Sequence, residues 1–384
     1  MSRIPALLDM ISDLVATPSV SSVNPALDHG NLAVIELLAN WLDDSGFQVE
    51  IMHLAGEPAK ANLIATLGSG SDGLVLAGHT DTVPYDEGKW RHDPFRLSCS
   101  DGKLYGLGTA DMKSFLALAL EACRDLRAGD LQRPLILLAT ADEETSMSGA
   151  RALVERGLPQ ARHALIGEPT GMRPVRMHKG ILMEAIRLRG QSGHSSDPAL
   201  GNSAIEAMHA VLGILINWRR ELQARYHNPF FAVPVPTLNL GHIHGGDNPN
   251  RICASCELHI DLRPLPGMDL QELRGELQNR VLSVLQDTGI EVEFESLFEG
   301  IPAMETPANA QIVQLAGKLT GHTAEAVAFG TEAPYLNRLG METVILGPGD
   351  IAQAHQPDEF IRLDTLAPSV DLLKSLINTV CIRD

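Results

Sequence analysis

Short runs of apolar residues, each about the length of one buried strand, recur through the first half of this 384-residue sequence. Helical or turn-rich stretches separate them, including an apolar helical pattern from Met112 to Leu126. Alternation of buried strands with helices is typical of a layered α/β domain, so we expect that fold class. The strand candidates are Gln48–Leu54, Asn62–Leu67, Leu74–His79, Pro134–Ala141 and Ala164–Glu168.

The rhythm of the sequence changes near Met177. The pattern that follows predicts strand, helix, two strands, helix and strand, which resembles a compact α+β, ferredoxin-like module. After Pro302 the α/β pattern resumes, ending in a helix predicted at Thr365–Val380. A chain of 384 residues exceeds the usual size of one hydrophobic core. We therefore predict an α/β domain made of residues 1–176 and 299–384, with residues 177–298 inserted as a separate domain.

Charge and cysteine content exclude several functional classes. The sequence has 30 Lys and Arg against 48 Asp and Glu, and its net charge of −18 would repel a nucleic-acid backbone. No apolar stretch approaches the roughly 20 residues needed to cross a bilayer. Five cysteines are an odd number for a disulfide framework, so we expect reduced thiols. These features predict a cytoplasmic protein with neither nucleic acid nor membrane as a partner.

Two familiar motifs are rejected because their context is wrong. Gly68–Gly73 satisfies G-x-G-x-x-G, but a predicted strand and not a helix follows it, so we interpret it as a hairpin turn. The Cys253 and Cys256 pair has the C-x-x-C spacing, yet it lies in a predicted strand that would send the thiols to opposite faces. No G-x-S-x-G nucleophile motif is present. Dinucleotide binding and serine-hydrolase chemistry are therefore not expected.

Three polar residues, His79, Asp81 and Asp111, lie at or near the ends of predicted strands and helices. His79 ends a strand, and Asp81 follows two residues later, suited to orient the imidazole through its far ring nitrogen. A lone histidine at a strand end is often only structural. Asp111 lies at the start of a predicted helix, where capping alone explains an aspartate.

Further acidic residues make a metal site the better interpretation. Asp142, Glu143 and Glu144 follow a buried strand directly, and three crowded carboxylates repel one another unless a cation compensates. Glu168 ends another buried strand, and His355 lies in a late polar loop. The set offers five nitrogen and oxygen ligands, which exceeds one tetrahedral zinc. A carboxylate shared between two metals explains the count.

These motifs resemble the M20 metallopeptidase family, on the segments Gly78–Pro84, Gly106–Lys113, Asp142–Glu144, Gly167–Thr170 and Ala354–Glu359. The resemblance implies two Zn²⁺ per subunit, with Co²⁺ able to substitute. It implies one zinc on His79, Asp111 and Glu168, and the other on His355, Asp111 and Glu144, with Asp111 as the bridge. Glu143 would be the general base for a hydroxide formed between the metals. The inserted domain would serve as a lid and a dimerisation domain.

Longer segments resemble the proteobacterial acetylornithine deacetylases of this family, at residues 104–113, 139–146, 178–180, 190–198, 236–246 and 329–334. The implied activity is hydrolysis of the amide of N2-acetyl-L-ornithine to L-ornithine and acetate, in arginine biosynthesis. Desuccinylation of N-succinyl-L,L-diaminopimelate, or a broad N-acyl amino acid deacylase, stays open as an alternative. A catalytically silent metal-binding scaffold is another, although such a protein needs no base at Glu143.

Residues outside the metal motifs have less specific interpretations. The resemblance implies that Arg251, beside Asn250, binds the substrate α-carboxylate, although a surface arginine in a turn is the alternative. It also implies that His194 steadies the tetrahedral oxyanion in the active site of a partner subunit, and hence a homodimer. Glu332 is a candidate for binding the side-chain ammonium of ornithine. The residues His242 and His244 alternate along one predicted strand as a metal pair would, but we interpret both as structural histidines with satisfied hydrogen bonds.

Overall fold

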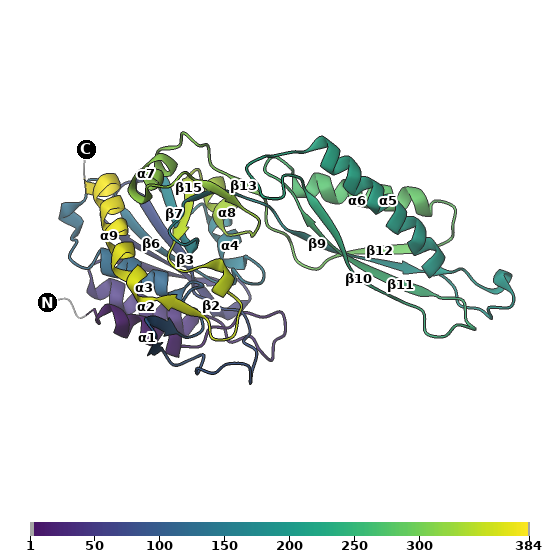
Figure 1. The fold of residues 1–384 in the computed structure, drawn as a ribbon, viewed down its shortest axis with the longest axis horizontal. Helices are drawn as coiled ribbons and strands as arrows, with labels where there is room; N and C mark the ends of the chain where they lie inside the picture. Colours follow the sequence, from purple (N-terminus) through teal and green to yellow (C-terminus); the bar gives the residue numbers. More distant parts are fainter. Residues whose placement is uncertain (1–3, 383–384) are drawn as a thin grey trace. The chain divides into compact units, whose positions relative to one another are not determined.

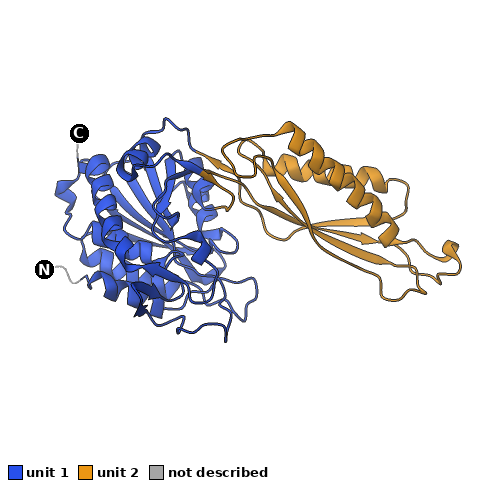
Figure 2. Cartoon of the chain, in the orientation of Figure 1, with its two compact units in different colours: residues 1–176, 306–325, 331–384 blue, residues 177–305, 326–330 orange. Residues whose placement is uncertain are grey.

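The computed structural model describes residues 4–382, which divide into two compact units (Figure 2). Within the described residues, unit 1 comprises 4–176, 306–325 and 331–382, and unit 2 comprises 177–305 and 326–330. Unit 2 thus interrupts unit 1 in the sequence. Residues 1–3 and 383–384 of the predicted domains lie outside the described residues.

Unit 1 is built around a nine-stranded mixed sheet, whose edge strand at Met304–Glu305 is grouped with unit 2 (Figure 1). The neighbours β6–β3, β3–β7 and β7–β15 are parallel. β3, β6 and β7 are buried along their whole length, which explains why their sequences are apolar without alternation. The α/β fold class is thereby confirmed. The strand order is β1 (Gln48–Leu54), β2 (Glu57–Leu67), β6 (Leu135–Thr140), β3 (Leu74–His79), β7 (His163–Pro169), β15 (Glu342–Gly347), β8 (Val175–His178) and β13 (Met304–Glu305), and β14 (Glu325–Val327) pairs with β8.

Helices flank this sheet. α3 (Lys113–Ala122) packs on β3, β6 and β7, and α1 (Leu7–Ala16) and α9 (Leu366–Ile377) cover it from outside. All residues of α3 except Glu121 are therefore buried. No helix in residues 4–382 has both the length and the apolar character needed to cross a membrane. The remaining helices of unit 1 are α2 (Leu32–Asp44), α4 (Ser148–Arg156), α7 (Gln311–Thr320) and α8 (Ala333–Arg338), and a separate small sheet contains β4 (Ser98–Ser100), β5 (Lys103–Tyr105) and β16 (Phe360–Arg362).

The interpretation of Gly68–Gly73 as a hairpin turn is wrong. β6 lies between β2 and β3 in the sheet, so the segment passes over an intervening strand. Helices α4 and α8 were not expected either, because both are short and α4 contains few apolar residues. α4 buries only Gly149, Ala150 and Leu153, and α8 is six residues long.

Unit 2 is a four-stranded antiparallel sheet with two helices on one face (Figure 1). Buried and partly exposed residues alternate along its central strand β11, so one face packs on the helices and the other is open. The order strand, helix, two strands, helix, strand agrees with the predicted ferredoxin-like pattern. The sheet order is β10 (Thr237–Gly245), β11 (Ser255–Arg263), β9 (Leu182–Arg189) and β12 (Glu291–Ser296), and the helices are α5 (Ala204–Arg225) and α6 (Leu270–Leu285).

The C-terminal boundary of the inserted segment of unit 2 lies later in the sequence than the predicted residue 298. Residues 299–305 belong to unit 2. Ile301 exchanges backbone hydrogen bonds with Ile181, and Arg274 of α6 donates to the carbonyl of Glu299 at 2.6 Å. Residues 326–330 also group with unit 2. The predicted boundary is corrected accordingly, since these long-range contacts are not visible in the local sequence pattern.

Candidate metal centre

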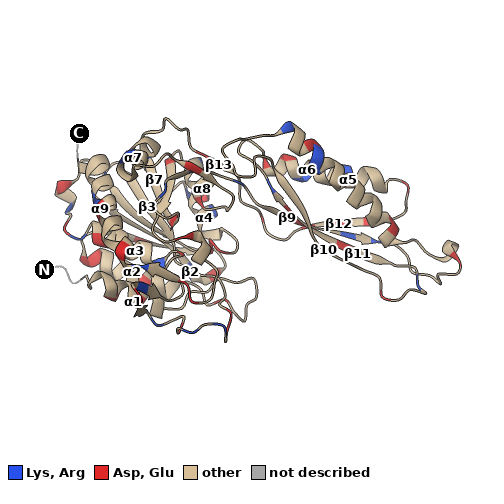
Figure 3. Cartoon of the chain, viewed as in Figure 1, with Lys and Arg blue, Asp and Glu red and all other residues tan. Residues whose placement is uncertain are grey.

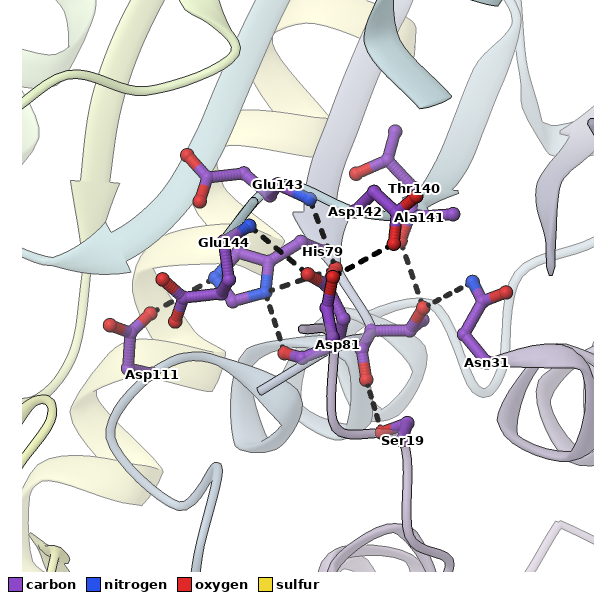
Figure 4. Close-up of polar contacts among 12 residues, drawn as sticks. Ser19, Asn31, His79, Asp81, Asp111, Thr140, Ala141, Asp142, Glu143 and Glu144 are labelled. Carbon is purple, nitrogen blue, oxygen red and sulfur yellow. Dashed lines mark hydrogen bonds and ion pairs between the residues drawn. The ribbon is translucent and has the colours of Figure 1, made fainter. Parts of the chain in front are cut away.

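The carboxyl ends of the parallel strands in unit 1 carry a cluster of histidine and acidic side chains. His79 is the last residue of β3, and Glu168 is the residue before the end of β7. Glu143 and Glu144 follow β6, and Asp111 precedes α3 (Figure 4). Parallel strands end at the same edge of a sheet, which is where open α/β sheets place their sites. The fold therefore collects residues that are widely spaced in the sequence.

Asp111 lies between two histidines and directs one carboxylate oxygen toward each. Its Oδ1 is 3.0 Å from Nε2 of His79, and its Oδ2 is 3.6 Å from Nε2 of His355. His355 also lies 3.0 Å from Oε2 of Glu144, and His79 lies 3.9 Å from Oε1 of Glu168. Asp111 does not cap α3, whose N-cap residue, Met112, makes no side-chain cap hydrogen bond. A carboxylate placed in this way is suited to bridge two cations.

The orientation of His79 is set by the backbone. Its Nδ1 lies 2.8 Å from the carbonyl oxygen of Asp81, whereas the Asp81 carboxylate is 3.8 Å away, beyond hydrogen-bonding distance. Donation from Nδ1 to this carbonyl leaves the lone pair of Nε2 free to bind a metal. The expected orienting role of Asp81 thus belongs to its main chain in this structure.

The carboxylate of Asp81 instead supports the acidic turn after β6. It accepts the backbone N–H groups of Glu143 and Glu144, at 3.2 and 3.0 Å (Figure 4). Asp81 is buried, and burial, ahead of the charge of Glu144, raises its pKa to about 6 although His79 opposes the rise. Asp81 therefore determines where the backbone of both glutamates lies.

Glu359 holds the segment that carries Asp111, a role that the sequence analysis missed. Its Oε1 accepts the N–H groups of Ala110 and Asp111 at 2.7 and 3.0 Å, and its Oε2 accepts that of Gly108 at 3.1 Å. Glu359 is buried, and burial together with the charge of Asp111 raises its pKa to about 8. The sequence did contain a signal for this residue, because Glu359 lies in the same motif as His355.

A buried ion cluster anchors the other side of the acidic turn. Asp142 adopts a left-handed backbone with φ of 57°, a conformation that aspartate adopts more readily than most residues with a side chain. Its carboxylate binds Lys60 at 2.8 Å and accepts the hydroxyl groups of Ser21 and Ser148, each also at 2.8 Å. Burial alone would lower the pKa of Lys60, but its contacts with Asp142, and with Asp28 and Glu57, raise it. These contacts hold Asp142 in place beside Glu143.

The electrostatics of the cluster fit divalent cations. Burial, and then the charge of a neighbouring carboxylate, raises the pKa of Glu143 and of Glu168 well above the ordinary value. Burial would lower the pKa of His79, yet the hydrogen bond to Asp111 and the charge of Glu168 raise it. So many buried carboxylates are unfavourable without compensating positive charge. Imidazole nitrogens and carboxylate oxygens are also ligands that zinc binds well.

The side chains come close enough to form two overlapping ligand groups. One contains His79, Asp111 and Glu144, and the other contains His79, Glu143 and Glu168. Within each group the candidate ligand atoms lie within 4.8 Å of one another. The predicted assignment of ligands places His355 on the second metal and gives Glu143 no metal to bind. This assignment stays a prediction. The position of Glu143 beside His79 and Glu168 also allows it to be a metal ligand.

Glu332 is buried directly before α8, with 1% of its surface exposed. Neither carboxylate oxygen makes a hydrogen bond of ordinary geometry within residues 4–382, although the hydroxyl of Thr140 lies close enough to affect its pKa. Burial raises its pKa to about 7, although Thr140 and His79 oppose the rise. Its predicted contact with a substrate ammonium stays a prediction.

The other predicted substrate-binding residues lie together in unit 2. His194 and Arg251 form an antiparallel backbone bridge, and both are exposed, as is Asn250. Nδ1 of His194 accepts the backbone N–H of Ser196 at 3.2 Å. The guanidinium of Arg251 binds the carboxylate of Asp247 at 2.6 Å.

Comparison with known proteins gives a family match and several similar structures. Residues 75–379 match the sequence profile of peptidase family M20/M25/M40. Aminopeptidase PepT from Bacillus cereus is 22% identical with a TM-score of 0.75, covering 97% of this chain and 98% of its own. The M20 metallo-carboxypeptidase Sso-CP2 from Sulfolobus solfataricus is 17% identical with a TM-score of 0.76 over 97% and 98%. The YXEP protein of Bacillus subtilis, described as a dinuclear metal-binding peptidase, is 16% identical with a TM-score of 0.66 over 97% of each chain. These similarities cover both units and show a shared fold.

Proposed function

Because the chain belongs to peptidase family M20/M25/M40, we propose that it hydrolyses the amide bond of N2-acetyl-L-ornithine to L-ornithine and acetate. Family membership makes it a metal-binding hydrolase. The observation that carries the hydrolytic chemistry is the Asp111 carboxylate, which faces His79 with one oxygen and His355 with the other. The substrate is proposed from the segments that resemble acetylornithine deacetylases, and it would place the enzyme in arginine biosynthesis.

The residues present fit two Zn²⁺, with Co²⁺ as a substitute, held by His79, Asp111, Glu144, Glu168 and His355. When bound, such cations polarise a carbonyl group and lower the pKa of water. Glu143 would accept the proton of the attacking water and return it to the nitrogen of the leaving amine as the amide bond breaks. Its raised pKa, caused by burial and by the charge of Glu168, makes it a stronger base than an exposed glutamate.

Substrate positioning is proposed for Arg251 and Asn250 of unit 2 and for Glu332 of unit 1. A guanidinium matches a carboxylate with two parallel hydrogen bonds, and the contact of Arg251 with Asp247 supports this use. The α-carboxylate of the substrate would replace Asp247, with Asn250 alongside. Glu332 would pair with the side-chain ammonium, an interaction that its buried carboxylate supports.

We also propose a homodimer formed through unit 2, in which His194 acts on the substrate of the partner subunit. β10 is an edge strand of the sheet, and an edge strand offers unpaired backbone groups to a second copy. Ile243 on β10 and Ile205 on α5 are 53% and 46% exposed, as an unpaired interface would require. All five cysteines are free thiols, which supports a reducing cytoplasmic location.

The test is a comparison of kcat/KM for two substrates under identical zinc or cobalt loading. N2-acetyl-L-ornithine is expected to exceed N-succinyl-L,L-diaminopimelate at least about tenfold, equal to about 1.4 kcal/mol in transition-state binding. N-acetyl-L-norvaline, which lacks the ammonium, is the matched control for side-chain recognition. Faster desuccinylation would overturn the substrate, and equal rates on all three would indicate a broad deacylase. No turnover with both metals bound would indicate a scaffold.

A further inference from the structure

Helices α5 and α6 cover one face of the unit 2 sheet and leave the other face open (Figure 1). Three histidines and a glutamate lie on the open face. Along β11, Glu257 and His259 are partly exposed, whereas the intervening Leu258 is buried beneath the helices. Along β10, His242 and His244 are two residues apart, so they share a face. Ile243 between them pairs in register with Leu258. The side chains of all four residues therefore leave the sheet on the open side.

The strand register arranges these side chains as two adjacent cross-strand pairs. His242 lies opposite His259, and His244 lies opposite Glu257. The ring centroids of His242 and His259 are 4.8 Å apart, and Nε2 of His259 contacts the carboxylate of Glu257. Side chains directly opposite on neighbouring strands have Cβ atoms about 4.5–5.5 Å apart. That spacing lets two imidazoles reach one metal ion at Zn–N distances of about 2.0–2.1 Å.

The histidines of β10 are free to bind a ligand. His242 and His244 are exposed, and their rings have no hydrogen-bond partner within residues 4–382. This corrects the expectation that both are structural histidines with satisfied hydrogen bonds. Because the rings are exposed, their side-chain rotamers can change without disturbing the core.

Arg187 on β9 is the nearby cation that competes for Glu257, which it binds at 3.0 Å. Its guanidinium also contacts Glu295 and lies 4.0 Å from Glu293, so it keeps acidic partners when Glu257 turns away. Figure 3 marks both basic and acidic residues on this sheet. The local charge is thus compatible with an added cation.

We propose that His242, His244, His259 and Glu257 form a further divalent-metal site, in addition to the metal centre of unit 1. Neutral imidazoles with one carboxylate suit Zn²⁺, Ni²⁺ or Cu²⁺ better than Mg²⁺ or Ca²⁺. Two histidines at i and i+2 of one strand and ligands from the neighbouring strand would give up to four donors. A metal bound there would join β10 to β11. The inference rests on the register of unit 2 and is independent of the proposed substrate.

The test uses full-length protein without a histidine tag, with its metal centre saturated with Zn²⁺. Equilibrium dialysis against buffered Zn²⁺, followed by elemental analysis, should give a third equivalent of zinc per chain. His242→Asn and His259→Asn should each weaken this third equivalent at least about tenfold while leaving the first two bound, which also shows that the variants are folded. His227→Asn, which removes another exposed histidine of unit 2, is the matched control.

A second measurement is retention of the tag-free protein on a Ni²⁺ column. Wild type and His227→Asn should be retained, and the two sheet variants should elute early. Only two zinc equivalents in the wild type, or a third that persists in both sheet variants, would overturn the proposal. Neither readout depends on turnover, so a wrong substrate would leave the result unchanged.

Discussion

Lys60 is the buried cation beside the acidic turn, and removing its charge tests how that turn is held. Its Nζ lies 2.8 Å from Asp142, 3.1 Å from Asp28 and 3.2 Å from Glu57. The side chains of Lys60 and Asp142 are only 10% and 4% exposed, so water cannot take the place of the lost contact. Lys60→Met keeps the length of the side chain and removes its charge.

The expected cost follows from the geometry. For one pair at 2.8 Å and an effective dielectric constant of about 20, Coulomb's law gives about 6 kcal/mol before desolvation is subtracted. In the variant, Asp142 stays buried with the hydroxyl groups of Ser21 and Ser148 as partners. Removing one member of a buried pair costs about 3–5 kcal/mol, a large part of a total stability of about 5–15 kcal/mol. We expect Lys60→Met to lower the free energy of unfolding by about 3–5 kcal/mol.

Urea titration of the purified variants measures this change. Lys89 and Asp86 form a matched control pair at 3.0 Å whose side chains are 68% and 58% exposed. Lys89→Met should therefore cost less than about 1 kcal/mol. Combining Lys60→Met with Asp142→Asn should cost less than the sum of the two single changes, because no uncompensated charge remains at Asp142. Equal costs for Lys60→Met and Lys89→Met would refute the reasoning.

Four further predictions concern individual residues. Glu143→Ala should lower kcat by about 10²–10⁴-fold while both metals remain bound, and loss of a full metal equivalent on elemental analysis would make Glu143 a ligand instead. Asp111→Ala should reduce metal occupancy at both positions, whereas loss of a single metal would contradict the bridge. Mixed dimers of His194→Ala and Glu143→Ala subunits should regain activity, because one of their two sites combines an intact base with an intact partner histidine; no recovery in verified mixed dimers would rule out action across the interface. Burial lowers the pKa of His178 to about 4, so the folded state resists its protonation. The free energy of unfolding should therefore be highest above a pH of about 6.5 and should fall by about 3 kcal/mol as the pH drops toward 4. Urea titrations across this pH range should show a smaller fall for His178→Asn.

Much of the fold and of the metal centre was predictable from local sequence. The apolar runs at β3, β6 and β7 are buried on both faces, so composition alone marks them as central strands. His79 and Glu168 lie at the ends of such strands, where parallel packing brings them together. The interpretation of Gly68–Gly73 as a hairpin was wrong because β6, which separates β2 from β3 in the sheet, begins at Leu135, 62 positions after Gly73.

The sequence by itself determined which residues are candidates for the chemistry, because motif composition and periodicity are local properties. Only the tertiary structure decided how those residues are held. The carboxylate of Asp81 supports the backbone of Glu144, 63 positions away, and Glu359 supports that of Asp111 across 248 positions. The exposed array of His242 and His259 likewise depends on strand register. Hydrogen-bond partners are chosen by the register and packing of whole strands, and these are set only when the complete sheet has formed.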